Sequence, residues 1–196
     1  KMERDIIADY QTRSAAAQAE ADKYGKLVNE YSLYRLGVFG LFIVSVCAAV
    51  SFDQISIMVV IGLLCALCFG WLITRQNEFE RLKNYFLDIK SINDNEIASM
   101  SHRTNIYPNG EWFEDDKHYY TSDLDIFGSN SLFQLIDRAA TLPGIRKLAS
   151  WLLEPSEKTV ILLRQQAVNE IAEKNDWRID LQAHLLFNLK QKREQI

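Results

Sequence analysis

Hydrophobic residues gather in two long runs of the chain instead of being spaced evenly. Residues 36–52 carry no charge over seventeen positions, and residues 54–74 carry none over twenty-one more, with Asp53 between them. A helix needs roughly 20 apolar residues to cross a bilayer core, and about 17 is the lower end. The pattern therefore predicts a two-helix transmembrane hairpin over residues 36–74. The alternative is a buried hairpin in a large soluble core, but buried core helices are usually shorter and carry some polar residues.

Basic residues flank the two runs and are absent between them. They are Lys23, Lys26 and Arg35 before the first run, and Arg75, Arg81 and Lys83 after the second. The positive-inside rule then places both termini in the cytoplasm and the turn at Asp53 outside, with the lipid bilayer as a partner. A cleaved signal peptide fits poorly, because the first run starts deep in the chain and a second follows at once.

Small residues and cysteines mark the second run. Gly62, Ala66 and Gly70 recur every four positions, which lets two membrane helices approach closely. They fit packing within the hairpin better than a dimer seam. Cys65 and Cys68 have the C-x-x-C spacing, but a redox pair needs an accessible thiolate of low pKa. In the middle of a span, the two cysteines are instead predicted to be small apolar fillers.

The segments beside the hairpin are polar. Residues 1–35 have no proline and an incomplete heptad pattern, which predicts a juxtamembrane helix. This helix is either solvated, paired with the helix that leaves the second run, or oligomer-forming. Residues 75–121 start with that second helix and become a polar linker from position 91, where the sequence YPNG signals a turn. Four residues of the linker region match no metal-ligand spacing and are predicted to be polar loop residues: His102, Asp115, Asp116 and His118.

Residues 122–196 have the pattern of a water-exposed helical domain. Asp123–Phe127 alternates polar and apolar residues, which predicts a short extended segment, and Gly128 allows a sharp turn. Ser129 or Ser131 can cap the helix that follows. Its predicted apolar stripe is Leu132, Leu135, Ile136 and Ala139.

Three more helices are predicted after this one. Thr141 caps the second helix, which tolerates Pro143 in its first turn and ends before Pro155. The predicted inner face of the second helix is Ile145, Leu148, Ala149 and Leu152; that of the third is Val160, Leu163, Ala167 and Ile171; and the fourth carries Trp177, Leu181 and Leu185. Four helices of this size make a marginal core, so more chain or a partner is expected to complete it.

The charge and motif content excludes several functions. The net charge is −4, and residues 76–196 carry all of that excess, which argues against a broad basic surface for nucleic acid. The sequence contains no Ser/His/Asp constellation, H-E-x-x-H, G-x-G-x-x-G or P-loop motif. No catalytic, cofactor-binding or metal-binding residue is therefore expected in this chain.

Residues 131–171 contain an ordered series of residue pairs, among them Ser131–Leu132, Asp137–Arg138 and Arg164–Gln165. This series resembles the core (lever) domain of the MutS family of DNA mismatch repair ATPases. The residues that carry the resemblance are Ser131, Leu132, Asp137, Arg138, Thr141, Gly144, Arg146, Trp151, Leu152, Pro155, Arg164, Gln165 and Val168. The chain departs from the family pattern where Ala139 replaces a common Thr, Pro143 follows Leu142, and Ser156 follows Pro155. A membrane hairpin before this stretch is similar to the membrane-anchored MutS-related proteins of bacteria.

The resemblance implies a mainly α fold, in which a transmembrane helical hairpin precedes a helical lever-type domain. It implies an ATPase with ATP and Mg²⁺ in a P-loop domain downstream of this chain, a homodimer of the full-length parent, and the bacterial inner membrane as the location. DNA would be contacted only through other domains, and the family's Phe-x-Glu wedge is absent from the sequence. The alternative is a membrane-tethered helical adaptor that makes protein contacts and does not bind DNA.

Overall fold

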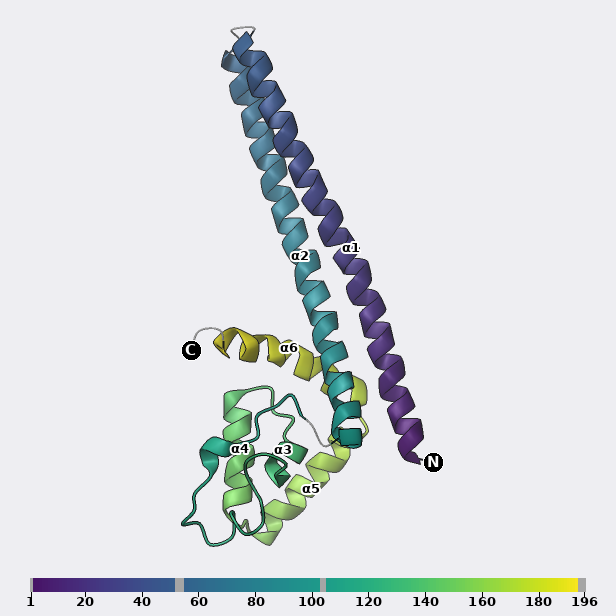
Figure 1. The fold of residues 1–196 in the computed structure, drawn as a ribbon, viewed down its shortest axis with the longest axis vertical. Helices are drawn as coiled ribbons and strands as arrows, with labels where there is room; N and C mark the ends of the chain where they lie inside the picture. Colours follow the sequence, from purple (N-terminus) through teal and green to yellow (C-terminus); the bar gives the residue numbers. More distant parts are fainter. Residues whose placement is uncertain (1, 52–54, 103–104, 194–196) are drawn as a thin grey trace. The chain divides into compact units, whose positions relative to one another are not determined.

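The protein is mainly α, as the sequence predicts. The computed structural model describes residues 2–51, 55–102 and 105–193, and these ranges contain helices and no strand (Figure 1). The elements are α1 (Met2–Ser51), α2 (Ile55–His102), the short 3-10 helix η1 (Glu111–Phe113), α3 (Leu132–Ile136), α4 (Leu142–Leu153), α5 (Lys158–Ala172) and α6 (Asn175–Arg193). The predicted turn at Asp53 lies outside the described residues.

The chain divides into two compact units. The first, which we term the hairpin unit, is Gln18–Phe86, and the second, the core unit, combines Lys1–Ala17 with Leu87–Ile196. These boundaries differ from the four segments that the sequence suggests, because α1 and α2 each contribute residues to both units.

The hairpin unit is an antiparallel pair formed by α1 and α2, which run side by side (Figure 1). Residues early in α1 contact residues late in α2: the rings of Tyr24 and Phe86 stack at 5.7 Å, and those of Tyr31 and Phe79 meet edge to face at 5.2 Å. Of the three alternatives that the sequence leaves open for the N-terminal helix, the structure thus has the one in which it pairs with the helix after the second run. Aromatic pairs of this geometry contribute beyond the apolar area that they bury.

The apolar runs of the hairpin unit face outward. No residue of the most apolar window of α1 is buried, and only 6% of the window of α2 is. Leu36 and Leu67 are 67% and 72% exposed. Both helices are long and apolar enough to cross a membrane. In the predicted small-residue stripe, a Cβ added to Gly62 would lie 3.6 Å from the Phe42 ring of α1, whereas Ala66 and Gly70 are exposed.

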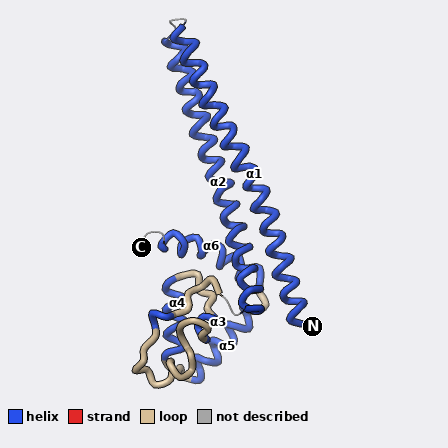
Figure 2. The backbone as a smooth tube through the Cα atoms, viewed as in Figure 1, coloured by secondary structure: helices blue, strands red, loops and turns tan. Residues whose placement is uncertain are grey.

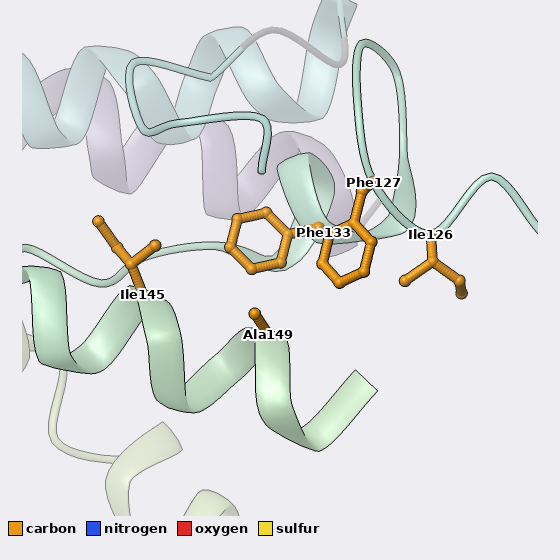
Figure 3. Close-up of a cluster of buried hydrophobic side chains, with 5 residues drawn as sticks. All are labelled: Ile126, Phe127, Phe133, Ile145 and Ala149. Carbon is orange, nitrogen blue, oxygen red and sulfur yellow. The ribbon is translucent and has the colours of Figure 1, made fainter. Parts of the chain in front are cut away.

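The core unit is built around one aromatic and aliphatic cluster (Figure 3). Its buried members are Ile126, Phe127, Phe133, Ile145 and Ala149. The Phe133 ring is 0% exposed, its centroid lies 5.4 Å from that of Phe127, and Ile145 and Ala149 approach it from α4. The prediction for α4 is confirmed, because Ile145 and Ala149 are buried while Leu148 and Leu152 pack against the cluster.

Irregular chain between α2 and α3 closes this cluster (tan in Figure 2). Gly110 has φ +74°, and a Cβ there would approach the Phe133 ring to 2.7 Å, so only glycine fits. Gly128 has φ +94°, consistent with the predicted sharp turn. The predicted extended segment at Asp123–Phe127 is wrong, because the amides of Leu124 and Ile126 bond back to the carbonyls of Tyr120 and Thr121 and coil the chain into turns.

Three predicted helix faces differ from the observed ones. The chain leaves α3 at Asp137, so this five-residue helix cannot form a two-turn stripe, and it buries Phe133 while Leu132, Leu135 and Ile136 stay more than 40% exposed. Helix α5 forms as predicted but buries no side chain, because the apolar run 160–163 spreads around the helix. The predicted α6 residues Trp177 and Leu181 are exposed, and the buried set is Ile179, Gln182, Ala183 and Leu186.

The predicted linker is partly helix. Residues 91–102 continue α2, and Ile92, Asn93, Asn95 and Ser99 are buried there. The prediction from position 91 was wrong for this stretch because its polar side chains find partners in the core unit, which a hydropathy pattern does not reveal.

Candidate functional site: a buried polar junction

A cluster of polar side chains joins four segments of the core unit. We term it the polar junction; it comprises Asn95, Glu96 and Ser99 of α2, Asn105 and Tyr107 of the following loop, Asp137 and Arg138 after α3, and Gln182 of α6. On α2 its residues continue the stripe of Asp88 and Ile92, with spacings of three and four residues that place them on one helix face.

Arg138 is the centre of the polar junction. Its Nε donates to Glu96 Oε1 at 2.6 Å and its Nη2 to Glu96 Oε2 at 3.1 Å, which makes the ion pair bidentate. Nη2 also donates to Ser99 Oγ at 3.1 Å, and Nη1 donates to the Asp137 carbonyl at 2.7 Å. Because the two side chains are only 25% and 17% exposed, this pair is better shielded from solvent than an ordinary surface salt bridge. Arginine's planar fork suits such two-point contact and fixes the orientation of the partner.

Asparagine side chains connect the loop after α2 to the end of α3 and to α2 itself. Asn105 Nδ2 donates to the carbonyls of Gln134 and Asp137, at 2.6 and 3.0 Å, and these carbonyls belong to the C-terminal end of α3. Asn95 Oδ1 accepts from the amide of Ile106 at 2.8 Å. Gln182 Nε2 donates to the Arg138 carbonyl at 3.3 Å, which adds α6. The junction thus satisfies backbone groups that short helices leave without partners.

Asp137 is a carboxylate with unusual surroundings. It is 0% exposed, and its Oδ1 accepts from the Ala139 amide at 2.9 Å. Its Oδ2 has no hydrogen-bond partner among the described residues. Burial raises the pKa of Asp137 to about 6, and this cause outweighs the Ala139 hydrogen bond and the nearby Arg138 charge, which both lower it. Asp137 therefore changes protonation nearer to neutral pH than an exposed aspartate does.

Tyr107 closes the junction from the loop. Its ring is 4% exposed, and its amide donates to Asn105 Oδ1 at 3.1 Å. Burial raises the pKa of the Tyr107 hydroxyl above its ordinary value, and the charges of Glu96 and Asp137 add to the effect. The hydroxyl stays protonated at physiological pH, and it has no hydrogen-bond partner among the described residues.

The arrangement is suited to holding segments together. The Arg138 guanidinium is paired with Glu96, and the carboxylate of Asp137 is buried, so neither group faces an open cleft. The start of α1 adds two more contacts inside the core unit: Arg178 Nη2 donates to the Tyr10 hydroxyl at 3.2 Å, and Arg13 forms an ion pair with Asp176. Helices α1, α2 and α6 and the chain after α3 are thereby linked by polar contacts.

The other residues of the sequence resemblance lie outside the junction. Ser131 caps α3 by accepting from the Gln134 amide at 3.2 Å, and Thr141 caps α4 by accepting from the Gly144 amide at 3.3 Å, as predicted. The Arg164 guanidinium lies 4.2 Å from the centre of the Trp151 ring, a cation–π contact between α4 and α5. Leu152 packs against the core cluster. The remaining members are exposed: Leu132, Arg146, Pro155, Gln165 and Val168.

A small acidic cavity is a second feature of the core unit. It measures about 150 Å³ and is lined by Glu114, Asp115, Asp116, Thr121, Ser122, Asp125 and Phe127. Its carboxylates oppose the binding of phosphate groups. Among the described residues, no group of three or more His, Cys, Asp or Glu side chains is placed to hold a metal ion.

Of the residues in the polar junction, the sequence resemblance includes only Asp137 and Arg138. Asn95, Glu96 and Ser99 lay in the assumed linker, although their spacing continues a helical stripe through Ile92. That spacing was the available signal for a polar face on a continuing helix. Nothing local indicates a junction role for Asn105, Tyr107 or Gln182. The partners of Asn105 and Gln182 lie 29 to 44 residues away, and Tyr107 donates its backbone amide to the side chain of Asn105.

Comparison with known proteins adds no relative: no family model, curated protein or solved structure matches the chain. The polar junction, the exposed apolar helices and the sequence resemblance are the features of the chain that bear on its function.

Proposed function

We propose that this chain is the membrane-anchored N-terminal region of a MutS-like ATPase of the DNA mismatch repair family. In this proposal, the core unit holds the start of the lever domain, which relays motion between DNA-contacting parts and an ATPase domain elsewhere in the parent protein. The observation that carries it is the bidentate Arg138–Glu96 contact. It ties the MutS-like segment to α2, a helix that is continuous with the second apolar run.

The membrane part of the proposal rests on exposure and charge. Apolar side chains that cover the outside of two long helices are costly in water and favourable in lipid. The basic flanks and the absence of Lys and Arg between the runs place both termini in the cytoplasm. In a bacterium, the membrane concerned is the inner membrane.

In this proposal, the chain itself binds neither ATP nor DNA. ATP and Mg²⁺ belong to a P-loop domain of the parent, which we propose to be a homodimer. Non-specific DNA binding needs Lys and Arg that neutralise phosphates. The net charge of −4 and the acidic cavity oppose such binding by this chain.

A helical adaptor tethered to the membrane is the second candidate, and α5 favours it. No side chain of α5 is buried, and Leu162, Leu163 and Val168 are 53%, 66% and 63% exposed. Exposed apolar surface of this kind is typical of protein–protein contact sites. In the adaptor proposal, α5 binds a partner protein and no ATPase is involved.

Reading the gene beyond the codon for Ile196, and assaying the complete gene product, separates the two candidates. The MutS-like proposal predicts a G-x-x-x-x-G-K-[S/T] loop after a long helical stretch, and Mg²⁺-dependent ATP hydrolysis by the complete protein that is lost when the loop lysine is replaced by alanine. A stop codon shortly after Ile196, or a complete protein without ATPase activity, would favour the adaptor.

A further inference from the structure

Aromatic and basic side chains meet where the apolar runs of the hairpin unit end. The Tyr31 ring of α1 lies 6.4 Å from the Trp71 ring of α2, and Tyr31 also contacts Tyr34 at 5.7 Å. Arg35 and Arg75 lie within one turn of these rings along their helices. Tyr and Trp with arginine nearby are typical of the level at which a membrane helix passes the lipid headgroups.

Arg35 differs from Arg75 in its partners. Arg75 forms an ion pair with Glu78 at 2.8 Å. Arg35 instead donates from Nη1 to the neutral Gln76 Oε1 at 2.8 Å, and its guanidinium lies 5.3 Å from the centre of the Phe69 ring. Among the described residues, Arg35 makes no ion pair, and its buried Nε has no hydrogen-bond partner. The positive charge of Arg35 is therefore held in place but not neutralised.

The surroundings of Arg35 are apolar and open. Leu36 follows it in sequence and is 67% exposed, and Phe39, one turn further along the same face of α1, is 54% exposed. A ligand that satisfies this site must bring a negative charge to Arg35 and hydrocarbon to Leu36 and Phe39. A phospholipid has both parts, whereas a free phosphate ion leaves the apolar side chains in water.

We propose that Arg35, positioned by Gln76 and Phe69, binds the phosphate of an anionic phospholipid whose acyl chains lie along Leu36 and Phe39. The inference rests on the proposed insertion of the hairpin in a membrane. The preference for an anionic lipid follows from charge: a zwitterionic headgroup carries its own ammonium, while an anionic one leaves a net negative charge for the uncompensated guanidinium. One basic residue at such a surface contributes about 1 kcal/mol, which corresponds to roughly a fivefold preference.

Trp71 supplies a reporter at this level of the hairpin, since it is 56% exposed. The full chain is used, with the other three tryptophans (Trp112, Trp151 and Trp177, each at least 40% exposed) replaced by phenylalanine. It is reconstituted into phosphatidylcholine vesicles that contain increasing fractions of brominated phosphatidylglycerol or brominated phosphatidylcholine. Bromine quenches tryptophan fluorescence on contact, so the two quenching curves give the relative affinity of the lipids for the site.

The expected result is a roughly fivefold preference for phosphatidylglycerol that Arg35→Gln reduces to about one. Arg35→Lys should retain most of the preference, because it keeps the charge. Arg81→Gln is the matched control: Arg81 is exposed and six residues beyond Arg75, so the preference should persist.

Three results would overturn the proposal. Equal quenching by the two lipids in the unsubstituted site would exclude anionic selectivity, and an unchanged preference in Arg35→Gln would place the selectivity elsewhere. Loss of the preference on adding inorganic phosphate, but not chloride at equal ionic strength, would identify free phosphate as the ligand. Absence of quenching by either lipid would instead contradict membrane insertion itself, and with it the membrane part of the proposed function.

Discussion

The hairpin unit and the core unit place their apolar residues in opposite ways. Leu67 in the hairpin unit is 72% exposed, while Phe133 in the core unit is 0% exposed. The hairpin unit has the more hydrophobic sequence, yet leucines such as Leu36 and Leu67 are exposed, while the polar side chains of Arg35 and Gln76 bond to each other from α1 to α2. Hydrophobicity alone therefore does not decide burial. The surroundings matter as well: the leucine-rich exterior of the hairpin unit suits hydrocarbon, whereas the core unit buries its aromatic cluster away from water.

The two units also differ in what joins their segments. The hairpin unit relies on aromatic rings stacked between two helices, and the core unit combines a small apolar cluster with the polar junction. Removing apolar contacts or polar contacts should thus affect the two units differently.

Loss of the Phe133 side chain should give the largest effect. Phe133→Ala leaves a cavity at the centre of the core cluster and should lower the free energy of unfolding by about 3–5 kcal/mol. Leu135→Ala, two residues away and 45% exposed, should cost less than about 1 kcal/mol. Urea unfolding of the full chain in detergent micelles, followed by tryptophan fluorescence, measures both values. Equal losses of unfolding free energy in the two variants would show that α3 presents a different face to the core cluster.

A charge on the apolar exterior should affect only the hairpin unit. Leu67→Lys should disfavour membrane integration by about 2.5–3.5 kcal/mol, the cost of lysine near the centre of a span. Leu163→Lys on α5, at a similarly exposed leucine, should leave integration unchanged. Extraction of membranes at alkaline pH separates integrated from released chain. Release of neither variant, or of both, would contradict the contrast between the two exteriors.

Asp137 should make the core unit less stable as the pH rises. Its folded pKa of about 6 lies above the unfolded value, so between pH 4 and 6 the folded state binds more protons and stability falls with rising pH. At roughly 1.4 kcal/mol per pKa unit, the rise from an ordinary aspartate pKa to about 6 amounts to about 3 kcal/mol in total. Asp137→Asn cannot ionise and should lack this part of the slope. Urea unfolding at pH 4.0, 5.0, 6.0 and 7.5 gives the comparison, and parallel slopes in the two proteins would refute it.

Coupling between Arg138 and Glu96 should be smaller but measurable. A double-mutant cycle with Arg138→Gln and Glu96→Gln should give a coupling energy of about 1–2 kcal/mol, since the pair is bidentate and largely shielded. The exposed pair of Lys174 and Glu170, treated the same way, should give less than about 0.5 kcal/mol. A coupling energy for Arg138 and Glu96 as small as that of the surface pair would contradict the proposal that this ion pair of the polar junction ties the MutS-like segment to α2.

What the sequence revealed was local. The hairpin helices, the caps at Ser131 and Thr141, and the inner face of α4 follow from residue types and spacings over one or two turns. These features depend on the chain's immediate neighbours, so a single sequence is sufficient to predict them.

What the sequence did not reveal was decided by distant partners. The polar composition of residues 91–102 predicts a linker, but Glu96 forms an ion pair with Arg138, 42 residues later. The buried face of α6 includes Gln182, which bonds to the Arg138 carbonyl and shifts the register away from Trp177 and Leu181. A polar residue that is buried with a partner has the same local signature as one in solvent.

Membrane topology is the most direct test, because the proposed function places lipid around the hairpin unit and cytoplasm around the core unit. Cys47, Cys65 and Cys68 are first replaced by alanine, and a single cysteine is introduced by Gln54→Cys or Asn77→Cys. The variants are expressed in bacterial cells and treated with a thiol reagent that cannot cross membranes. We predict labelling of Gln54→Cys in intact cells, and labelling of Asn77→Cys only after the cells are opened. Labelling of Asn77→Cys but not of Gln54→Cys in intact cells would reverse the topology, and labelling of both only after opening would contradict the membrane hairpin.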